Sequence, residues 1–286
     1  MGDAATVAAA IRTATERLAA VSDTARIDAE LLMAHALGMA RSDMLLRAMR
    51  DPAPASFTAL VDRRAAHEPV AYITGQQAFY GLEMAVTHAV LIPRGDSETL
   101  IEAAREAFTD RPPTRILDLG TGSGALMLAA LSLWPDAEGV GIDASPAAVA
   151  VAAANADRLM SHVRFRLIVA DWRDSGWADA LGAFDLILCN PPYVEDTAKL
   201  DADVRDHEPA SALFAGPEGL DDYRTLIPQL PALLAPGGVA VIEIGHEQAD
   251  AVAAIARRSG FTSMLRRDLA RRPRALILRS IDLKTR

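Results

Sequence analysis

The stretch Asp118-Leu119-Gly120-Thr121-Gly122-Ser123-Gly124 decides the fold class of this chain. It follows a short apolar strand predicted over 116–119 and opens a helix predicted over 125–133. Glycines between a strand and a helix let the backbone turn sharply and approach a ligand closely. Ligands of open α/β sheets bind beyond the carboxyl ends of the strands. The stretch therefore predicts a ligand-binding loop in a sheet of this kind.

Asp143 ends the next predicted strand, over 140–142. A carboxylate at this place can accept hydrogen bonds from both hydroxyls of a ribose. Gly120, Gly122 and Ala125 also match the dinucleotide pattern G-x-G-x-x-A, in which Asp143 stands where a NAD-binding acid would. On these residues alone, several nucleotide-derived cofactors and a NAD-dependent dehydrogenase remain open.

Strands and helices alternate along the rest of the chain, which is typical of a mostly parallel sheet covered on both faces. Further strands are predicted over 163–169, 184–189 and 239–244, with a continuous helix over 220–234 before the last of them. The last two, over 262–266 and 275–280, have no helix between them and predict an antiparallel edge. The first 75 residues show only helical periodicity and predict a small bundle of four short amphipathic helices. We expect a helical domain over 1–75, a hairpin linker over 76–94 and an α/β domain over 95–286.

Residues 194–219 lack periodicity, and irregular loops of this length usually act as lids or binding loops. Two interpretations of its acidic part are open: a solvated loop, or a face that steers a basic partner protein. The acidic residues over 195–208 are Glu195, Asp196, Asp201, Asp203, Asp206 and Glu208. The formal net charge of the whole chain is −9, which argues against holding nucleic acid through phosphate neutralisation.

The single cysteine, Cys189, excludes an intrachain disulfide and fits a reducing compartment. The first residues lack the basic-then-apolar layout of a signal peptide, and no stretch approaches the length needed to span a bilayer. The histidines are not paired at metal-ligand spacing. We therefore expect a cytoplasmic protein without a membrane segment or a metal site.

The turn Asn190-Pro191-Pro192-Tyr193 comes directly after the strand predicted over 184–189. Two consecutive prolines fix two φ angles and remove two backbone donors. The turn therefore presents two acceptors, the Asn190 side-chain carbonyl and the Pro191 backbone carbonyl. Two acceptors at a rigid spacing suit a planar NH2 group, and Tyr193 offers a flat face to pack on it. The turn predicts group transfer to such a nitrogen by positioning, without a general base.

Taken in this order, 120–124, Asp143 and 190–193 resemble a class I methyltransferase that uses S-adenosylmethionine. Together with 93–98, 118–126, 141–146, 211–220 and 243–248, nearly the whole chain resembles the glutamine methyltransferases of peptide chain release factors, the PrmC (formerly HemK) family. The resemblance implies a Rossmann-like sheet with an antiparallel last strand and an N-terminal helical domain that recognises the substrate. It implies S-adenosylmethionine as methyl donor, S-adenosylhomocysteine as product, and class I release factors as partners.

The resemblance also assigns the site residues. Asn190, Pro191, Pro192 and Tyr193 would bind the substrate amide, with Asn190, Pro191 and Tyr193 as catalytic residues. Ser97 stands where the family has threonine, and Gly95 where it has proline. Arg271 replaces a family glycine, so the resemblance assigns no role to 268–274. The cofactor-binding residues would be Gly120, Thr121, Gly122, Ser123, Gly124, Asp143, Asp171, Trp172 and Asn190.

Other functions share parts of this pattern. The sister enzyme that acts on a glutamine of a ribosomal protein has nearly the same core motifs. DNA adenine methyltransferases and guanine-modifying ribosomal RNA enzymes share Asn-Pro-Pro-Tyr, but they need a basic groove, which this acidic chain does not offer. A NAD-dependent dehydrogenase does not explain 190–193. A non-catalytic binding module would not need both motifs intact.

Overall fold

The computed structural model describes residues 5–160 and 164–281. The chain divides into two compact units. The helical unit comprises Met1–Gln76 together with Leu200–His207, and the α/β unit comprises Gln77–Lys199 together with Glu208–Arg286. Residue 163, the first of the strand predicted over 163–169, lies outside the described residues.

The helical unit buries one apolar cluster, to which each of its longer helices contributes. Thr6 caps the first helix, because its hydroxyl accepts a hydrogen bond from the backbone N–H of Ala9 at 3.3 Å. The fifth helix, after Pro69, is an addition to the four predicted, since five residues are too few to show periodicity. The elements are α1 (Val7–Leu18), α2 (Ala25–Leu37), α3 (Arg41–Asp43), the short π-helix Met44–Ala48, α4 (Phe57–Ala65), α5 (Val70–Thr74) and α9 (Ala202–His207).

A buried guanidinium joins α9 to the rest of the helical unit. The Arg64 side chain is buried, and its Nε donates to Asp28 Oδ2 at 2.7 Å. Its Nη2 lies 2.9 Å from Asp203 Oδ2, and His67 Nδ1 lies 3.2 Å from the other Asp203 oxygen. A buried charge requires partners of opposite sign. Of the two interpretations left open for the acidic segment, a solvated loop does not fully describe Asp203, which lies in α9, is half-buried and pairs with side chains far away in the sequence.

The α/β unit is built on a seven-stranded sheet with the order β5-β4-β3-β6-β7-β9-β8. The first four pairings are parallel, and β9 pairs antiparallel with both β7 and β8. The predicted Rossmann-like sheet with an antiparallel last strand is confirmed. The strands are β3 (Arg115–Leu119), β4 (Glu138–Asp143), β5 (Phe165–Val169), β6 (Phe184–Cys189), β7 (Leu234–Glu243), β8 (Phe261–Arg267) and β9 (Pro273–Ser280).

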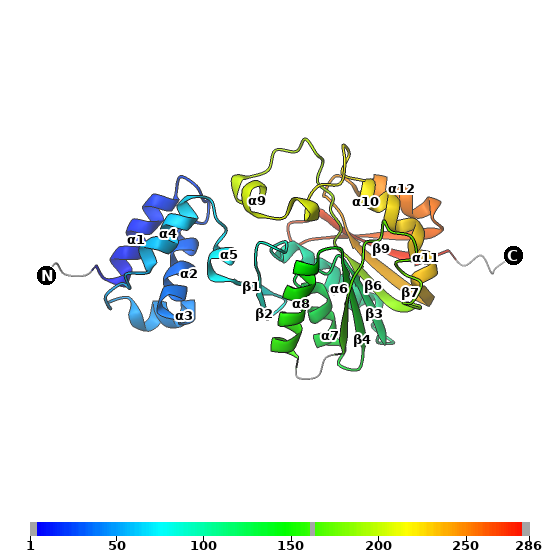
Figure 1. Ribbon diagram of the computed structural model, residues 1–286, viewed down its shortest axis with the longest axis horizontal. Coiled ribbons are helices and arrows are strands. Elements are labelled where there is room, and N and C mark those ends of the chain that lie inside the picture. The colour runs from blue at the N-terminus through cyan, green and yellow to red at the C-terminus, as the bar shows by residue number, and fades with distance from the viewer. Residues whose placement is uncertain (1–4, 161–163, 282–286) are drawn as a thin grey trace. The chain divides into compact units, whose positions relative to one another are not determined.

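Helices cover both faces of this sheet (Figure 1). Along each central strand successive side chains enter opposite layers, so Ile116 packs in one apolar cluster and Leu117 in the other. This burial on both faces explains the uninterrupted apolar runs of the central strands. One face carries α6 (Glu98–Ala107), α7 (Ala125–Leu133) and α8 (Pro146–Leu159), and the other carries α10 (Asp221–Leu226), α11 (Leu230–Leu233) and α12 (Ala249–Arg258).

Two elements of the α/β unit differ from prediction. The continuous helix expected over 220–234 is divided by the 3-10 turn Ile227–Gln229, because Pro228 and Pro231 lack the N–H of a regular helix. Strand β7 begins at Leu234 instead of 239, and its pairing with β6 shifts register between Phe184 and Leu186. The predicted hairpin is present as β1 (Gln76–Phe79) and β2 (Leu82–Ala85).

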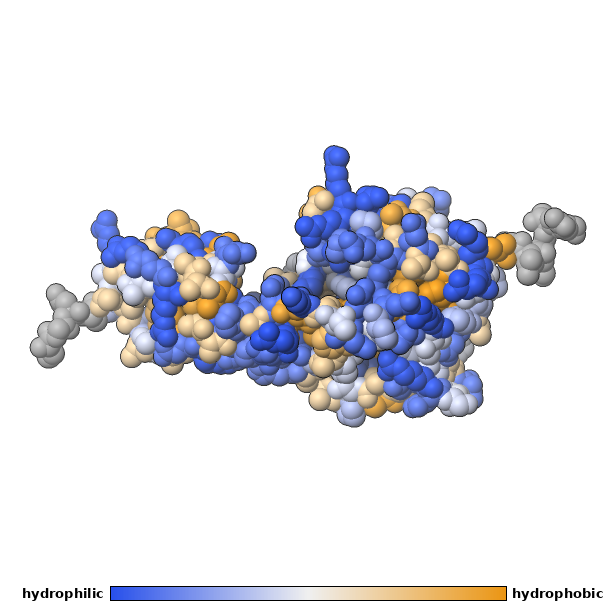
Figure 2. All heavy atoms as spheres, turned by 90° about the horizontal axis from the view of Figure 1, so that it is seen from above, coloured by the Kyte–Doolittle hydropathy of each residue, from blue (hydrophilic) through white to orange (hydrophobic). Residues whose placement is uncertain are grey.

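Hydrophilic residues cover most of the visible face of the α/β unit, with hydrophobic residues exposed in small groups (Figure 2). Among the described residues of this unit, the large exposed apolar side chains are Val169, Met264, Leu269 and Ile281. Within the described part of the chain, every helix is too short or too polar to cross a bilayer.

Candidate active site

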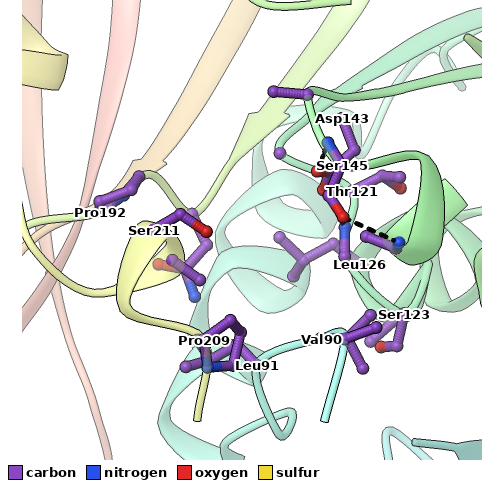
Figure 3. A pocket seen from close by; sticks show the side chains of 18 of the residues that line it. Val90, Leu91, Thr121, Ser123, Leu126, Asp143, Ser145, Pro192, Pro209 and Ser211 are labelled. Atoms are coloured by element: carbon purple, nitrogen blue, oxygen red, sulfur yellow. Dashed lines mark hydrogen bonds between the residues drawn. The ribbon is translucent and has the colours of Figure 1, made fainter. Parts of the chain in front are cut away.

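A pocket opens at the carboxyl ends of β3, β4 and β6, the sheet edge at which the sequence places its motifs (Figure 3). The loop after β3, the end of β4 and the turn after β6 all contribute to its wall. Residues of two other segments, 89–93 and 209–212, close the opposite side. The wall includes Phe79, Val90, Leu91, Ser97, Gly120, Thr121, Gly122, Ser123, Asp143, Ser145, Asp171, Trp172, Asn190, Pro192, Pro209 and Ser211.

The glycines after β3 serve two different purposes. Gly120 and Gly122 have φ of +73° and +54°, a backbone conformation that glycine adopts without strain, and both line the pocket. A Cβ on Gly120 would lie 3.4 Å from Cη2 of Trp172. Gly124, with φ of +83°, faces Leu128 and Phe165 in the core. Gly124 therefore fixes the entry into α7 and does not line the pocket, unlike the other two glycines.

Asp143 links the glycine loop to the next helix. Its Oδ2 accepts a hydrogen bond from the Gly122 N–H at 2.9 Å, and its Oδ1 accepts one from the Ser145 N–H at 2.9 Å. Burial raises the pKa of this carboxyl, while the two backbone donors act to lower it. Each oxygen keeps a further lone pair that faces no backbone donor, so the carboxylate can accept two hydroxyl donors from a ligand.

A second carboxylate lies beneath the same loop. Asp118 is fully buried, and its Oδ2 accepts a hydrogen bond from the Thr121 hydroxyl at 2.6 Å. Its Oδ1 has no hydrogen-bond partner among the described residues. Burial is the main cause that raises the pKa of Asp118 to about 7, and the nearby Asp143 raises it further. Asp118 is the first residue of the loop motif, and the sequence alone predicts no role for it.

Trp172 forms a fixed wall of the pocket. Its indole Nε1 donates to Asp222 Oδ1 at 3.0 Å, and its backbone carbonyl accepts from Gln229 Nε2 at 3.0 Å. The edge of the ring packs against the Gly120 backbone. The structure thus brings Asp171 and Trp172 to the same pocket as the glycine loop and Asp143.

The turn after β6 lies next to the glycine loop, because Leu119 and Cys189 are paired residues of adjacent parallel strands. Asn190 and Pro192 line the pocket, whereas Pro191 and Tyr193 do not. The Asn190 Nδ2 donates to the Ser97 hydroxyl at 3.5 Å. The acceptor end of the amide, Oδ1, is thereby the end left for a ligand.

Tyr193 is held from three directions. Its hydroxyl donates to Glu243 Oε1 at 3.1 Å, and its backbone N–H donates to the Leu213 carbonyl at 3.1 Å. Its carbonyl accepts from Gln248 Nε2 at 3.0 Å. Burial, together with the neighbouring Glu243 carboxylate, raises the pKa of the phenol well above its usual value. Tyr193 is therefore a neutral donor whose position is fixed within the protein.

The acidic segment supplies wall residues that the sequence analysis did not identify. Glu208 is buried, pairs with Arg94 and accepts a hydrogen bond from the Ile92 N–H at 3.2 Å. A solvated loop therefore does not describe Glu208 either. This anchor precedes Pro209 and Ser211, which line the pocket. The only signal for Ser211 in the sequence is its place in the 211–220 stretch that carries the family resemblance.

Two family models match the chain. The PrmC N-terminal domain matches residues 9–75, and a methyltransferase domain matches residues 110–260. The release factor glutamine methyltransferase of Rhodospirillum rubrum is 42% identical over 260 residues, covering 89% of this chain and 78% of that protein. The enzyme of the same name from Xylella fastidiosa is 39% identical and covers 94% and 96%.

The chain belongs to the release factor glutamine methyltransferase family. Among solved structures, a methyltransferase from Pyrococcus furiosus is similar in fold, with a TM-score of 0.52 and 16% identity, covering 70% of this chain and 90% of that one. The resemblance given by the motifs 118–126 and 190–193 is thus confirmed, and so is the enzyme class.

Proposed function

We propose that this chain transfers a methyl group from S-adenosylmethionine to the side-chain amide nitrogen of a glutamine in a class I release factor. One observation carries the proposal. The acceptor turn at Asn190 lies directly beside the glycine loop: a Cβ on Gly120 would be only 3.8 Å from the backbone carbonyl oxygen of Asn190. An amide bound at the turn would face a methyl donor bound at the loop.

The residues around the loop fit the methyl donor. Gly122 lines the pocket, and a Cβ there would meet only the Gly120 backbone oxygen, at 4.0 Å, and would project into the pocket. Asp143 retains acceptor capacity for the two ribose hydroxyls, and the Trp172 ring closes the far wall beside Asp171. When bound, the donor supplies a methyl group activated by a sulfonium charge. Gly120, Thr121, Gly122, Ser123, Asp143, Asp171 and Trp172 would hold it, with Gly124 setting the loop.

The turn would orient the acceptor nitrogen. Asn190 Oδ1 and the Pro191 carbonyl accept one hydrogen bond each from the substrate NH2, which fixes both N–H bonds. The nitrogen lone pair is then directed at the methyl carbon rather than into the amide π system. The N–C bond forms as the C–S bond breaks, and one amide proton leaves to water. Positioning and electrostatics supply the rate, so no general base is needed.

Two further roles belong to this proposal. Tyr193 and Pro192 would support the substrate amide at the turn. The helical domain over 1–75 would contact the release factor away from the pocket, which is supported by the match of its residues 9–75 to the PrmC N-terminal domain.

The test is a methylation assay with the purified chain and labelled S-adenosylmethionine. A class I release factor, a ribosomal protein mixture and duplex DNA are offered separately, and the methyl group is mapped by mass spectrometry. We expect label on one glutamine side chain of the release factor. Label only on a ribosomal-protein glutamine, or only on a nucleic-acid base, would overturn the proposal.

A further inference from the structure

The indole ring of Trp172 is held at two of its edges. Its Nε1 donates a hydrogen bond to Asp222 Oδ1 at 3.0 Å. Its Cη2 and Cζ3 lie against Gly120, where an added Cβ would be 3.4 and 3.6 Å from them. The residue is only 8% exposed, although it belongs to the pocket wall. The hydrogen bond and the glycine backbone together fix the plane of the ring in that wall.

Asp222 is itself fixed by the helix that carries it. It lies in α10 and is fully buried, as is its neighbour Tyr223. The Tyr223 hydroxyl donates to the backbone carbonyl of Glu243 at 2.9 Å, which ties α10 to the end of β7. The acceptor for the indole N–H therefore lies on an element that is anchored to the sheet.

The residues that follow α10 hold the backbone of Trp172. Gln229 Nε2 donates to the Trp172 carbonyl at 3.0 Å and to the Thr225 carbonyl at 2.8 Å. The Gln229 Oε1 accepts from Trp177 Nε1 at 2.6 Å, so both ends of this amide are engaged. The side chain and the main chain of Trp172 thus both depend on one segment, residues 222–229.

The Asp222 oxygen that faces the indole accepts hydrogen bonds in either protonation state of the carboxyl. Oδ1 also accepts from Arg173 Nη2 at 2.6 Å, whereas Oδ2 is buried without a hydrogen-bond partner among the described residues. Burial raises the pKa of Asp222, and the Trp172 and Arg173 donors act to lower it. A proton on this carboxyl would lie on Oδ2, because Oδ1 already faces two donors. The hydrogen bond to Trp172 therefore does not require a charged Asp222.

The loss of this acceptor would have a definite effect on the ring. A buried indole N–H needs a hydrogen-bond partner, and leaving it without one is costly. Without the Asp222 oxygen, the ring would have to turn toward water in the pocket to satisfy its N–H. A ring that is already fixed saves the cost of ordering it when a flat group of a ligand packs on it.

We propose that Asp222 is a positioning residue that holds the Trp172 ring in the orientation in which it packs on the base of S-adenosylmethionine. The inference rests on the proposed function in one respect, namely that Trp172 contacts the cofactor. Asp222 follows the 211–220 stretch and lies outside the motifs that carry the family resemblance.

The first test measures cofactor affinity by calorimetry with S-adenosylhomocysteine. Asp222→Leu removes the acceptor at similar volume and should raise the Kd by about tenfold. The same factor should appear with 5′-methylthioadenosine, which keeps the base but lacks the amino-acid part. Asp222→Asn keeps an acceptor oxygen and should stay within about threefold of the wild type. Asp221→Leu, at the exposed neighbouring carboxylate of α10, is the matched control and should leave the Kd unchanged.

Steady-state kinetics separate positioning from a general loss of structure. For Asp222→Leu, the KM for S-adenosylmethionine should rise with the Kd. The kcat at saturating cofactor should stay within about twofold of the wild type, because the turn over 190–193 is unchanged. A fall in kcat with an unchanged cofactor KM and Kd would overturn the proposal, and so would an Asp222→Asn enzyme as weak in cofactor binding as Asp222→Leu.

A double-mutant cycle tests whether Asp222 acts through the indole N–H. Trp172→Phe keeps an aromatic ring but removes this donor, and it should weaken S-adenosylhomocysteine binding by about tenfold. Adding Asp222→Leu should then change the Kd by less than about twofold, whereas independent effects would multiply to about a hundredfold. A multiplied loss would overturn the proposal. Should Asp222→Leu not fold, Trp172→Phe alone decides, since a wild-type Kd in that variant would show that the N–H is not needed.

Trp172→Ala separates the two proposals. If Trp172→Ala binds S-adenosylhomocysteine weakly while Asp222→Leu binds it as the wild type does, only the positioning role fails. If Trp172→Ala binds it normally, the proposed cofactor contact of Trp172 fails first.

Discussion

Two neighbouring strand ends in this sheet carry opposite chemistry. After β3 the chain continues into Gly120–Gly124, where positive φ angles keep the backbone open to the pocket. After β6 it continues into Asn190–Tyr193, where two prolines remove backbone donors and leave acceptors. The paired strand residues Leu119 and Cys189 bring both turns to the same edge. A pocket that must hold two reactants is thus built from one open loop and one rigid turn.

Each of these turns also rests on a buried carboxylate. Asp118 lies under the glycine loop and Glu243 behind the acceptor turn, and each has one oxygen without a regular hydrogen bond among the described residues. Burial raises the pKa of both groups. They differ in what lowers their pKa: the Thr121 hydroxyl and the Met127 backbone act on Asp118, whereas the Tyr193 hydroxyl and the charge of Arg274 act on Glu243. The pKa of the loop carboxylate, Asp118, is about 7, so this group titrates near neutral pH.

The largest expected effect falls on the acceptor turn. Asn190→Ala should lower methyl transfer by about a hundredfold or more, because it removes one of two acceptors that orient the reacting nitrogen. The Kd for S-adenosylmethionine should change by less than about threefold. Mass spectrometry of the release factor and calorimetric titration of the cofactor measure the two quantities. Equal loss of binding and transfer would show that the two turns do not divide the work as proposed.

The next effect concerns the pH dependence of stability. The pKa of Asp118 is about 7 in the folded chain and 3.8 as its ordinary value. Between these two pH values the folded state holds a proton that the unfolded state has lost. The stabilisation that this group contributes is therefore complete below its ordinary pKa, and it is lost as the pH rises through about 7. From pH 5 to pH 7 the free energy of unfolding of the wild type should fall by about 2 kcal/mol relative to that of Asp118→Asn.

Urea unfolding of both proteins between pH 5 and pH 8 measures this difference. Other titrating groups cancel in the comparison, and Asp136→Asn, at an exposed position before β4, is the matched control. A constant difference between wild type and Asp118→Asn across this range would contradict the raised pKa.

The third effect tests the glycine loop. Gly120→Ala should weaken S-adenosylmethionine binding by about tenfold, because the added Cβ meets the Trp172 ring and narrows the pocket. It should also cost about 1–2 kcal/mol of stability, since φ is +73°. Gly81→Ala is the control: its φ is +77° but a Cβ there meets nothing within 4 Å. Calorimetry should therefore find altered cofactor affinity in Gly120→Ala alone.

The smallest effect concerns the phenol of Tyr193. Tyr193→Phe removes one donor to Glu243 but keeps the ring, and the Arg274 charge remains. We expect kcat to fall by about threefold. The kcat of Tyr193→Ala should fall much further, because this substitution also removes the flat face proposed for the substrate amide. Steady-state rates with the release factor compare the two, and equal losses would assign the role to the hydroxyl.

Much of the fold could be predicted from the sequence because its signals are local. The boundaries of α7 and β6 follow from a glycine loop and an apolar run that end abruptly. The prediction failed at 220–234, where Pro228 and Pro231 divide the helix, and in part of the acidic segment. Asp203 and Glu208 looked solvated because their partners Arg64 and Arg94 are more than a hundred residues away in the chain.

The sequence by itself determined which strand each motif follows and the chemistry of each turn, since glycine and proline set backbone angles wherever they stand. Only the tertiary structure decided that β9 lies between β7 and β8. That placement puts Arg274 next to the end of β7, because Glu243 pairs with Ala275, and it lets Arg274 reach Asp96 and Asp268. A buried hydrogen-bond network joins residues through space, and its members leave no periodic or neighbouring mark along the chain.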